Sequence, residues 1–304
     1  MSASRSRAGL VATAVGLGLL FPIGWVLAHL PPGMGLAVGR RLGDALWWLL
    51  PRRRRLTLDN LARTLGREQS PAELRRLGRR SFQHVGMNLI EACRYFLRPT
   101  DVMLSRVRVE GDEHLRTAVA QGRGVLILTA HYGNWELLAA AHSLSGLPLS
   151  IVMRPLDHPF LDDLAARFRR RSGAELIIKR QAVREVLQAL RRQRMVGILL
   201  DQNATRAEGV FVPFFGVPAS TSKGLAVLAL RTGAPVVPAF LRRDPDGRGH
   251  CVDVGAPIPP PPDGDVATYT ATFNQVLEAT IRRAPEQWLW MHARWRTQPR
   301  EAAS

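Results

Sequence analysis

Between residues 106 and 254, short apolar segments rich in β-branched residues alternate with segments of helical periodicity. Apolar strands that alternate with helices are typical of a mostly parallel sheet covered by helices on both faces. Such sheets bind ligands at the carboxyl ends of their strands. The sequence therefore predicts an α/β fold, with strands at 106–109, 125–129, 150–153, 175–178 and 196–200, further extended segments at 210–215, 236–241 and 251–254, and helices at 136–145, 159–172, 182–193 and 220–232.

One strand of this series ends at a candidate catalytic base. The apolar run that starts at Gly124 ends at His131, and after Tyr132-Gly133 an asparagine opens an apolar run typical of a helix. His131 and Glu136 can meet only if the histidine lies in the turn and the glutamate in the first helical turn. A carboxylate there would hold the imidazole in one tautomer and raise its basicity, as proton removal from a hydroxyl requires. A simple capping arrangement at a helix start is the alternative.

The charge balance indicates a polyanionic partner. The chain has 42 basic and 25 acidic residues, a formal net charge of +17, and only Lys179 and Lys223 as lysines. Codon bias in a GC-rich genome explains the preference for arginine but not the excess of positive charge. Nucleic acid, an anionic membrane surface, a phosphorylated lipid and an acidic carrier protein are all compatible partners. Cys93 and Cys251 have no paired spacing, so neither a disulfide framework nor a zinc site is predicted.

The N-terminal apolar run predicts a membrane anchor. Residues 8–30 are apolar apart from glycines, a threonine, Pro22 and His29, and this length is enough to span a bilayer core of about 30 Å. More arginines follow the run than precede it, so the positive-inside rule places the large domain in the cytoplasm. Residues 34–50, with Trp47-Trp48, predict a helix that lies at the membrane interface or packs on the core.

We therefore expect residues 1–55 to form the anchor and interfacial helix, and residues 56–304 to form the α/β domain. Residues 56–99 would be a helical lead-in to that domain, because Ser70-Pro71-Ala72-Glu73 is a capping box with proline at the first helical position. Three tryptophans near the C-terminus, Trp288, Trp290 and Trp295, either return the tail to the membrane side or pack in the core.

Several motifs of well-known enzyme classes are absent from the sequence. The chain has no Gly-x-Ser-x-Gly elbow, which disfavours a serine hydrolase of the α/β-hydrolase type. It also has no phosphate-binding loop followed by Gly-Lys-Ser/Thr and no His-Glu-x-x-His. These absences disfavour the usual nucleotide-binding and zinc-protease classes.

The motifs that are present resemble one family, the lipid A late acyltransferases. These are the lauroyl and myristoyl transferases, with relatives that acylate phosphatidylinositol mannosides. The resemblance covers nearly the whole chain, and its strength lies in the order and spacing of the motifs. They are the Arg-x6-Asn-Leu segment at 53–61, His131-Tyr-Gly-Asn-Trp-Glu136, Val152-Met-Arg154, Leu200-Asp201-Gln202, the segments 209–216 and 232–238, and the Trp-rich tail at 285–295.

This resemblance implies a glycerolipid-acyltransferase-like α/β fold in which His131 and Glu136 form the catalytic dyad. His131 would take a proton from a lipid hydroxyl, which then attacks the thioester carbonyl of an acyl donor. Backbone N–H groups after Gly133 would stabilise the oxyanion. Neither a cofactor, nor a metal, nor a covalent acyl-enzyme is implied.

Three further residues are candidates for substrate binding. Arg154 matches a position at which the family resemblance implies contact with a phosphate of the acceptor. Asp201, at the end of a predicted strand on the His131 side of the sheet, would orient the acceptor or active-site groups. Glu208 resembles in place a glutamate with which the glycerolipid enzymes contact their acceptor.

The predicted reaction is transfer of a fatty acyl chain to a hydroxyl of a phosphorylated glycolipid, with a lipid A precursor as acceptor. Acyl carrier protein is the expected donor and coenzyme A the alternative, since both are polyanionic. We expect the enzyme at the inner membrane with its catalytic domain on the cytoplasmic side, and no nucleic acid partner. The alternatives are acylation of a phosphatidylinositol mannoside, a membrane-tethered anion-binding protein without chemistry, and a thioesterase or lipase.

Overall fold

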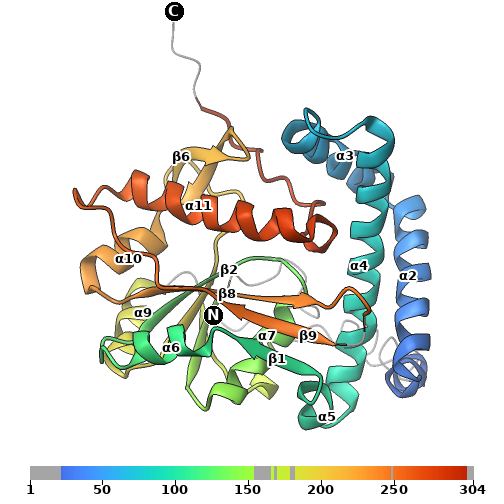
Figure 1. Cartoon of the computed structure of the whole chain (residues 1–304), viewed down its shortest axis with the longest axis horizontal. Coiled ribbons are helices and arrows are strands. Elements are labelled where there is room, and N and C mark those ends of the chain that lie inside the picture. The colour runs from blue at the N-terminus through green and yellow to red at the C-terminus, as the bar shows by residue number, and fades with distance from the viewer. Residues whose placement is uncertain (1–21, 154–165, 168–169, 179–181, 248, 300–304) are drawn as a thin grey trace, which may run out of the picture.

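The computed structural model describes residues 22–153, 166–167, 170–178, 182–247 and 249–299, and consists of a twisted sheet between two layers of helices (Figure 1). The helices are α2 (Pro32–Leu49), α3 (Pro51–Leu65), α4 (Pro71–Leu97), α5 (Thr100–Leu104), α6 (Asp112–Val119), α7 (Trp135–Ala141), α9 (Ala182–Arg191), α10 (Gly224–Thr232) and α11 (Val266–Arg283), with short 3₁₀ helices η1 (His142–Ser145) and η3 (Pro285–Gln287). The strands are β1 (Val107–Glu110), β2 (Val125–Thr129), β3 (Leu149–Met153), β4 (Glu175–Ile178), β5 (Met195–Leu199), β6 (Gly209–Phe214), β7 (Val217–Ser222), β8 (Val236–Arg243) and β9 (His250–Val254).

The main sheet has seven strands in the order β1-β9-β8-β2-β5-β3-β4. All its pairs are parallel except β8 with β9. Every residue of the central strand β2 is buried, and its side chains alternate between two hydrophobic cores. Leu126 and Leu128 pack with α9, α10 and α11, whereas Val125 and Ile127 pack with α5, α6 and α7. The predicted α/β fold, a mostly parallel sheet flanked by helices, is therefore confirmed.

A hairpin outside the main sheet corrects one predicted helix. The segment expected to be helical from residue 220 instead continues as β7 to Ser222 and pairs antiparallel with β6. The two residues between these strands, Phe215 and Gly216, have φ angles of 52° and 71°, as a tight hairpin turn of the primed type requires. The helix predicted at 159–172 lies mostly outside the described residues.

The predicted N-terminal helical membrane anchor is wrong for the part of the chain that the structure describes. Across residues 22–299, apart from the gaps given above, no helix combines the length and the apolar character needed to cross a bilayer. The described end of the expected anchor stops at Pro31-Pro32, and α2 begins anew at Pro32. Proline at the first turn starts a helix but cannot continue one, because it has no N–H to donate. Residues 8–21 of the expected anchor lie outside the described residues.

Helix α2 instead packs lengthwise on α4, which was the alternative for this segment (Figure 1). Its buried face consists of Gly35, Gly39, Gly43 and Trp47. A Cβ atom on Gly39 would lie 2.6 Å from the Cα of Met87, so the two backbones touch. Helix α4 begins at the predicted capping box, with Glu73 N–H donating to the Ser70 side chain, and ends at Leu97, as expected. The division of the chain at residue 55 stays a prediction.

Alanine at Gly43 is expected to destabilise the fold by about 1–3 kcal/mol, the usual cost of overpacking. Its methyl group would overlap the backbone of Phe82 and Gln83, which cannot move aside as a side chain would. Urea unfolding of Gly43→Ala measures the effect. The matched control is Gly33→Ala, also in α2, because nothing lies within 4 Å of an added Cβ there. Equal stability of the two variants would contradict the backbone contact.

Candidate active site

The parallel pairing of β2 with β5 brings His131 and Asp201 together. Thr129 of β2 lies opposite Leu199 of β5, so the residues two positions beyond each strand end are neighbours. The Oδ1 atom of Asp201 lies 2.9 Å from Nδ1 of His131. The backbone N–H of His131 donates to Oδ2 of the same carboxylate at 3.0 Å. The imidazole is thus held at the carboxyl end of the central strand, where the strand pattern predicted a site.

The carboxylate of Asp201 is buried and ionised. Its side chain is 3% exposed, against 20% for that of His131. Burial alone would raise the pKa of Asp201, but the charge of His131 and the hydrogen bonds from His131 and Trp288 hold this pKa below its usual value. An ionised carboxylate only accepts, so Nδ1 of the imidazole must be the donor. The other nitrogen, Nε2, then carries the lone pair of the neutral ring, and the Gln202 amide nitrogen lies 3.2 Å from it.

The C-terminal tail forms the floor of this site. Trp288 donates from Nε1 to Oδ2 of Asp201 at 2.8 Å. The N–H of Leu289 donates to the carbonyl of His131 at 3.0 Å. Asn60 of α3 fixes the tail from the other side by donating to the carbonyls of Trp290 and His292, both at 2.8 Å. The exposed fractions of Trp288, Trp290 and Trp295 are 2%, 0% and 4%, so these side chains pack in the core.

A buried polar cluster holds the turn that follows His131. Asn134 accepts from the N–H of Leu137, which caps α7, and donates to Glu91 of α4 at 2.7 Å. Glu91 forms a bidentate pair with Arg243 at the end of β8. Burial would raise the pKa of Glu91, but the charges of Arg243 and His250 hold this pKa well below its usual value. The position of the turn therefore depends on an ion pair between α4 and β8.

Only glycine fits at position 133 of the same turn. Its φ angle is 58°, and a Cβ atom there would overlap the carbonyl of Leu241. The Gly133 N–H donates to the carbonyl of Gln287, and the Asn134 N–H to that of Leu241. These two N–H groups are thus already bonded within the protein, and the oxyanion donors expected from the start of α7, after Gly133, stay a prediction.

The predicted site residues fall in different places. Glu136 is half-buried in the first turn of α7, as expected, while the carboxylate hydrogen-bonded to the His131 ring is that of Asp201. Glu208 is exposed just before β6 and accepts from Thr205. Arg154 lies outside the described residues. The roles predicted for Glu136, Arg154 and Glu208 stay predictions.

Sequence reasoning missed the part played by Trp288, Glu91 and Arg243. Trp288 carried a signal, because it belongs to the recognised tail motif, but a hydrogen bond from a tail to a strand end cannot be read from spacing. Glu91 lies on the buried face of α4, and a lone acidic residue among apolar ones is a sign of a buried partner. Arg243 gave no comparable signal among so many arginines.

One group of possible metal ligands lies away from this site, on β1 and β9. Ligand atoms of Glu110, Cys251 and Asp253 lie within 4.8 Å of one another. Burial and the two neighbouring carboxylates raise the pKa of the Cys251 thiol to about 12, so the thiolate that a metal prefers is not formed at neutral pH. Arg242 already pairs with both carboxylates. The proximity of these two carboxylates is therefore explained by their ion pairs with Arg242.

His292 makes the stability of the protein dependent on pH. It accepts from the N–H of Asn203, and burial lowers the pKa of its ring to about 4. In the unfolded chain this histidine has an ordinary pKa near 6.5 and binds a proton as the pH falls from 7 to 5. In the folded chain the ring stays neutral over this range. We therefore expect the free energy of unfolding to fall by about 1 kcal/mol between pH 7 and pH 5 because of His292, after allowance for solvent at a half-buried ring.

Urea unfolding at both pH values measures this loss, with His292→Gln as the comparison. Glutamine keeps an acceptor for Asn203 but does not titrate. The variant should therefore lose less stability between pH 7 and pH 5 than the parent does. Buried His84, whose pKa burial lowers to about 3, acts equally in both proteins. Equal losses in the two would contradict the assignment to His292.

Comparison with known proteins finds one class of enzyme, the acyltransferases. Residues 5–297 match the family model described as bacterial lipid A biosynthesis acyltransferase. The lipid A biosynthesis lauroyltransferase of Escherichia coli is 33% identical over 288 residues, covering 94% of this chain and 92% of that protein. The palmitoleoyltransferase of the same organism is 29% identical over 290 residues, with the same two coverages of 94% and 92%. A phosphatidylinositol mannoside acyltransferase of Mycobacterium tuberculosis is 30% identical over 202 residues, covering 63% of this chain and 60% of that protein.

Proposed function

The chain belongs to the bacterial lipid A biosynthesis acyltransferase family and is an acyltransferase, and we propose that it moves a fatty acyl chain from a thioester to a hydroxyl of a phosphorylated lipid A precursor. The observation that carries the proposal is the His131–Asp201 pair at the carboxyl end of β2. Its Nδ1–H is held by a buried carboxylate, and its Nε2 is left as a base on the partly exposed side.

The proposed chemistry is direct transfer with His131 as general base. Nε2 takes the proton of the acceptor hydroxyl while its oxygen attacks the thioester carbonyl. The tetrahedral intermediate then collapses, the carbon–sulfur bond breaks, and the leaving thiolate takes the proton back from the imidazolium. Asp201 stays ionised throughout, holds the ring in one tautomer and stabilises its positive charge. The Gln202 amide, 3.2 Å from Nε2, is a candidate donor beside the reacting atoms.

Two carboxylates compete for the role of orienting His131. The motif resemblance favours Glu136, and the hydrogen-bond geometry favours Asp201. We assign the orienting role to Asp201, because Nδ1 has a single N–H to donate and the acceptor at 2.9 Å is Asp201. Glu136, in the first turn of α7, remains the second candidate for an acidic catalytic role.

Substrate contacts and location complete the proposal. Arg154 would bind a phosphate of the acceptor bidentately, and Glu208 would contact the acceptor from the start of β6. Acyl carrier protein is the proposed donor, since an acidic carrier suits a chain of net charge +17. The reaction would take place at the inner membrane, on the cytoplasmic side. The similarity to a phosphatidylinositol mannoside acyltransferase makes that glycolipid the second candidate acceptor.

Mass spectrometry of the products tests the proposal. Purified protein is incubated with acyl carrier protein or coenzyme A thioesters of several chain lengths, together with either acceptor. The expected product is an acceptor heavier by one acyl group, formed from the carrier protein thioester and the lipid A precursor. Free fatty acid without acylated lipid would instead assign a thioesterase. Binding without any product, unaffected by His131→Ala, would assign an anion-binding protein.

A further inference from the structure

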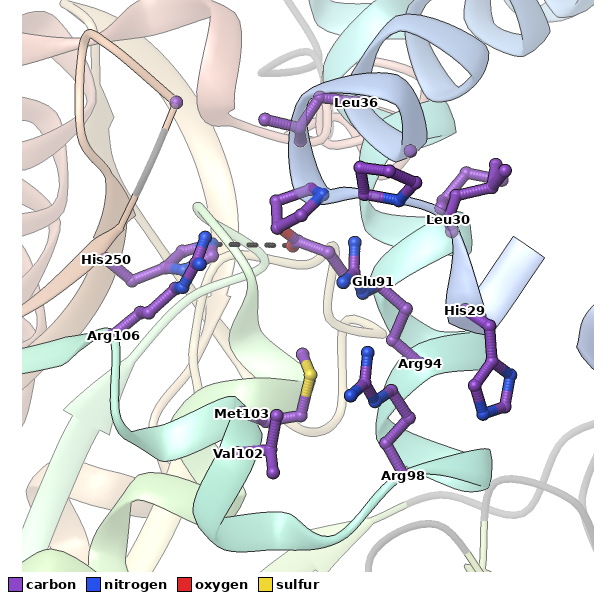
Figure 2. Close-up of a pocket in the computed structure, with 15 residues that line it drawn as sticks. His29, Leu30, Leu36, Glu91, Arg94, Arg98, Val102, Met103, Arg106 and His250 are labelled. Atoms are coloured by element: carbon purple, nitrogen blue, oxygen red, sulfur yellow. Dashed lines mark ion pairs between the residues drawn. The ribbon is translucent and has the colours of Figure 1, made fainter. Parts of the chain in front are cut away.

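A cavity of about 310 Å³ lies beside the polar cluster, away from the residues that hold His131. Its walls come from the start of α2, from α4 and α5, and from the strand ends at β1 and β9 (Figure 2). None of His131, Asp201, Gln202 and Trp288 lines it. The proposed transfer reaction therefore leaves this cavity without a role.

Three arginines from different parts of the chain surround the cavity. Arg94 lies on α4, Arg98 directly follows that helix, and Arg106 directly precedes β1 (Figure 2). Within the described part of the chain, no carboxylate lies within ion-pair distance of any of these guanidinium groups. Glu91 also lines the cavity, but it already pairs with Arg243 and His250. Among the described residues, the cavity therefore gathers three guanidinium groups that no carboxylate pairs at ion-pair distance.

The cost of this arrangement is visible at Arg94. Burial lowers the pKa of its guanidinium, the charges of Arg98 and Arg106 lower it further, and the charge of Glu91 opposes this shift. Gly35 of α2 makes room for the side chain, since a Cβ atom there would lie 3.2 Å from Nη1 of Arg94. Three cations at a cavity wall repel one another, and a bound anion with several oxygens removes that repulsion while accepting their hydrogen bonds.

The remaining walls are apolar. Leu30 and Leu36 line one side and Val102 and Met103 the other (Figure 2), and Ile90 also lines the cavity. Exposed apolar side chains continue outward from the cavity, because Trp25 is 51% exposed and stacks on the lining residue His29 at 4.4 Å. A free inorganic anion would use only the arginines. The apolar walls match a ligand that carries hydrocarbon beside its charge.

We propose that this cavity binds the phosphate group of an amphipathic lipid, with the arginines on the phosphate oxygens and the apolar walls against the adjoining methylenes. This site is additional to the one at His131. Guanidinium groups hold phosphate bidentately, and the hydrocarbon next to it removes the apolar wall from water.

Isothermal titration calorimetry with the full chain tests the proposal. The probe is dihexanoyl phosphatidic acid, kept below the concentration at which it aggregates, and the comparison ligands are inorganic phosphate and dihexanoylglycerol. The phosphatidic acid is expected to bind at least tenfold more tightly than either. If inorganic phosphate bound as tightly as the lipid, the proposed binding of an amphipathic lipid would be overturned and the cavity would be a plain anion site. Absence of saturable lipid binding would overturn the site altogether.

Charge-matched variants separate the cavity from the general positive charge of the protein. Arg98→Gln with Arg106→Gln should weaken binding at least tenfold, whereas Arg75→Gln with Arg80→Gln, on exposed positions of α4, should change it less than twofold. Val102→Glu, an exposed substitution at the cavity wall, should reproduce the loss without risk to folding. Equal losses in the cavity and control pairs would overturn the proposal. The His131→Ala variant should bind the lipid normally. Failure of the cavity proposal can therefore be told apart from failure of the proposed acyl transfer.

Discussion

Alanine at position 131 is expected to lower kcat for acyl transfer by about 10²–10⁴-fold, the usual contribution of a general base. The reason is that no other described side chain is placed at the carboxyl end of β2 with a buried carboxylate behind it. Steady-state rates with a carrier protein thioester and a lipid A precursor measure the change. Urea unfolding serves as a control, since His131→Ala also removes the ring that pairs with the buried Asp201 carboxylate and any loss of stability must be separated from the loss of rate. A variant that keeps its rate would rule out the proposed mechanism.

The same assay decides between the two carboxylates. Asparagine at position 201 would present an amide to the ring and favour the wrong tautomer, so Asp201→Asn should lose about 10²–10⁴-fold in kcat. Glu136→Gln keeps the shape of a side chain in the first turn of α7 and should lose less than tenfold. The reverse order of effects would restore the dyad that the motif resemblance implies. Both variants should leave the acceptor KM nearly unchanged, because neither is proposed to bind the acceptor directly.

Removal of either partner of the Glu91–Arg243 pair is expected to destabilise the protein by about 3–5 kcal/mol. The side chains of Arg243 and Glu91 are 5% and 10% exposed, so Arg243→Ala or Glu91→Ala leaves one buried charge without its partner. Urea unfolding measures the loss. The double variant Glu91→Leu with Arg243→Met removes both charges at similar volume and should regain much of it, as apolar replacement of buried pairs often does.

The double variant also separates stability from catalysis. It lacks the acceptor for Asn134, whose side chain caps α7 beside His131, so its kcat should stay low even where its stability recovers. Single variants that lose less than 1 kcal/mol would show that water or another group compensates the remaining charge. Full recovery of kcat in the double variant would show that the turn does not depend on Glu91.

Local patterns were sufficient wherever the deciding interactions are close in sequence. The capping box at Ser70 predicted the start of α4, and the apolar run before His131 predicted β2. The extended segment at 210–215 was predicted, but its pairing with β7 was missed because that pairing depends on the turn at Phe215-Gly216, where a non-glycine residue has positive φ. The membrane anchor was wrong for the described residues, because across them no helix is long and apolar enough to cross a bilayer.

What the sequence determined by itself is the family and the α/β fold class, and it also places the proposed base His131 at a strand end. Motif order, strand alternation and a histidine at a strand end are all properties of contiguous segments, so no partner has to be known. The tertiary structure alone decided which acid meets that base. Asp201 lies 70 residues from His131 and reaches it because β5 pairs with β2 in parallel, with Thr129 opposite Leu199. Strand adjacency is set by the packing of the whole sheet, and no local pattern encodes it.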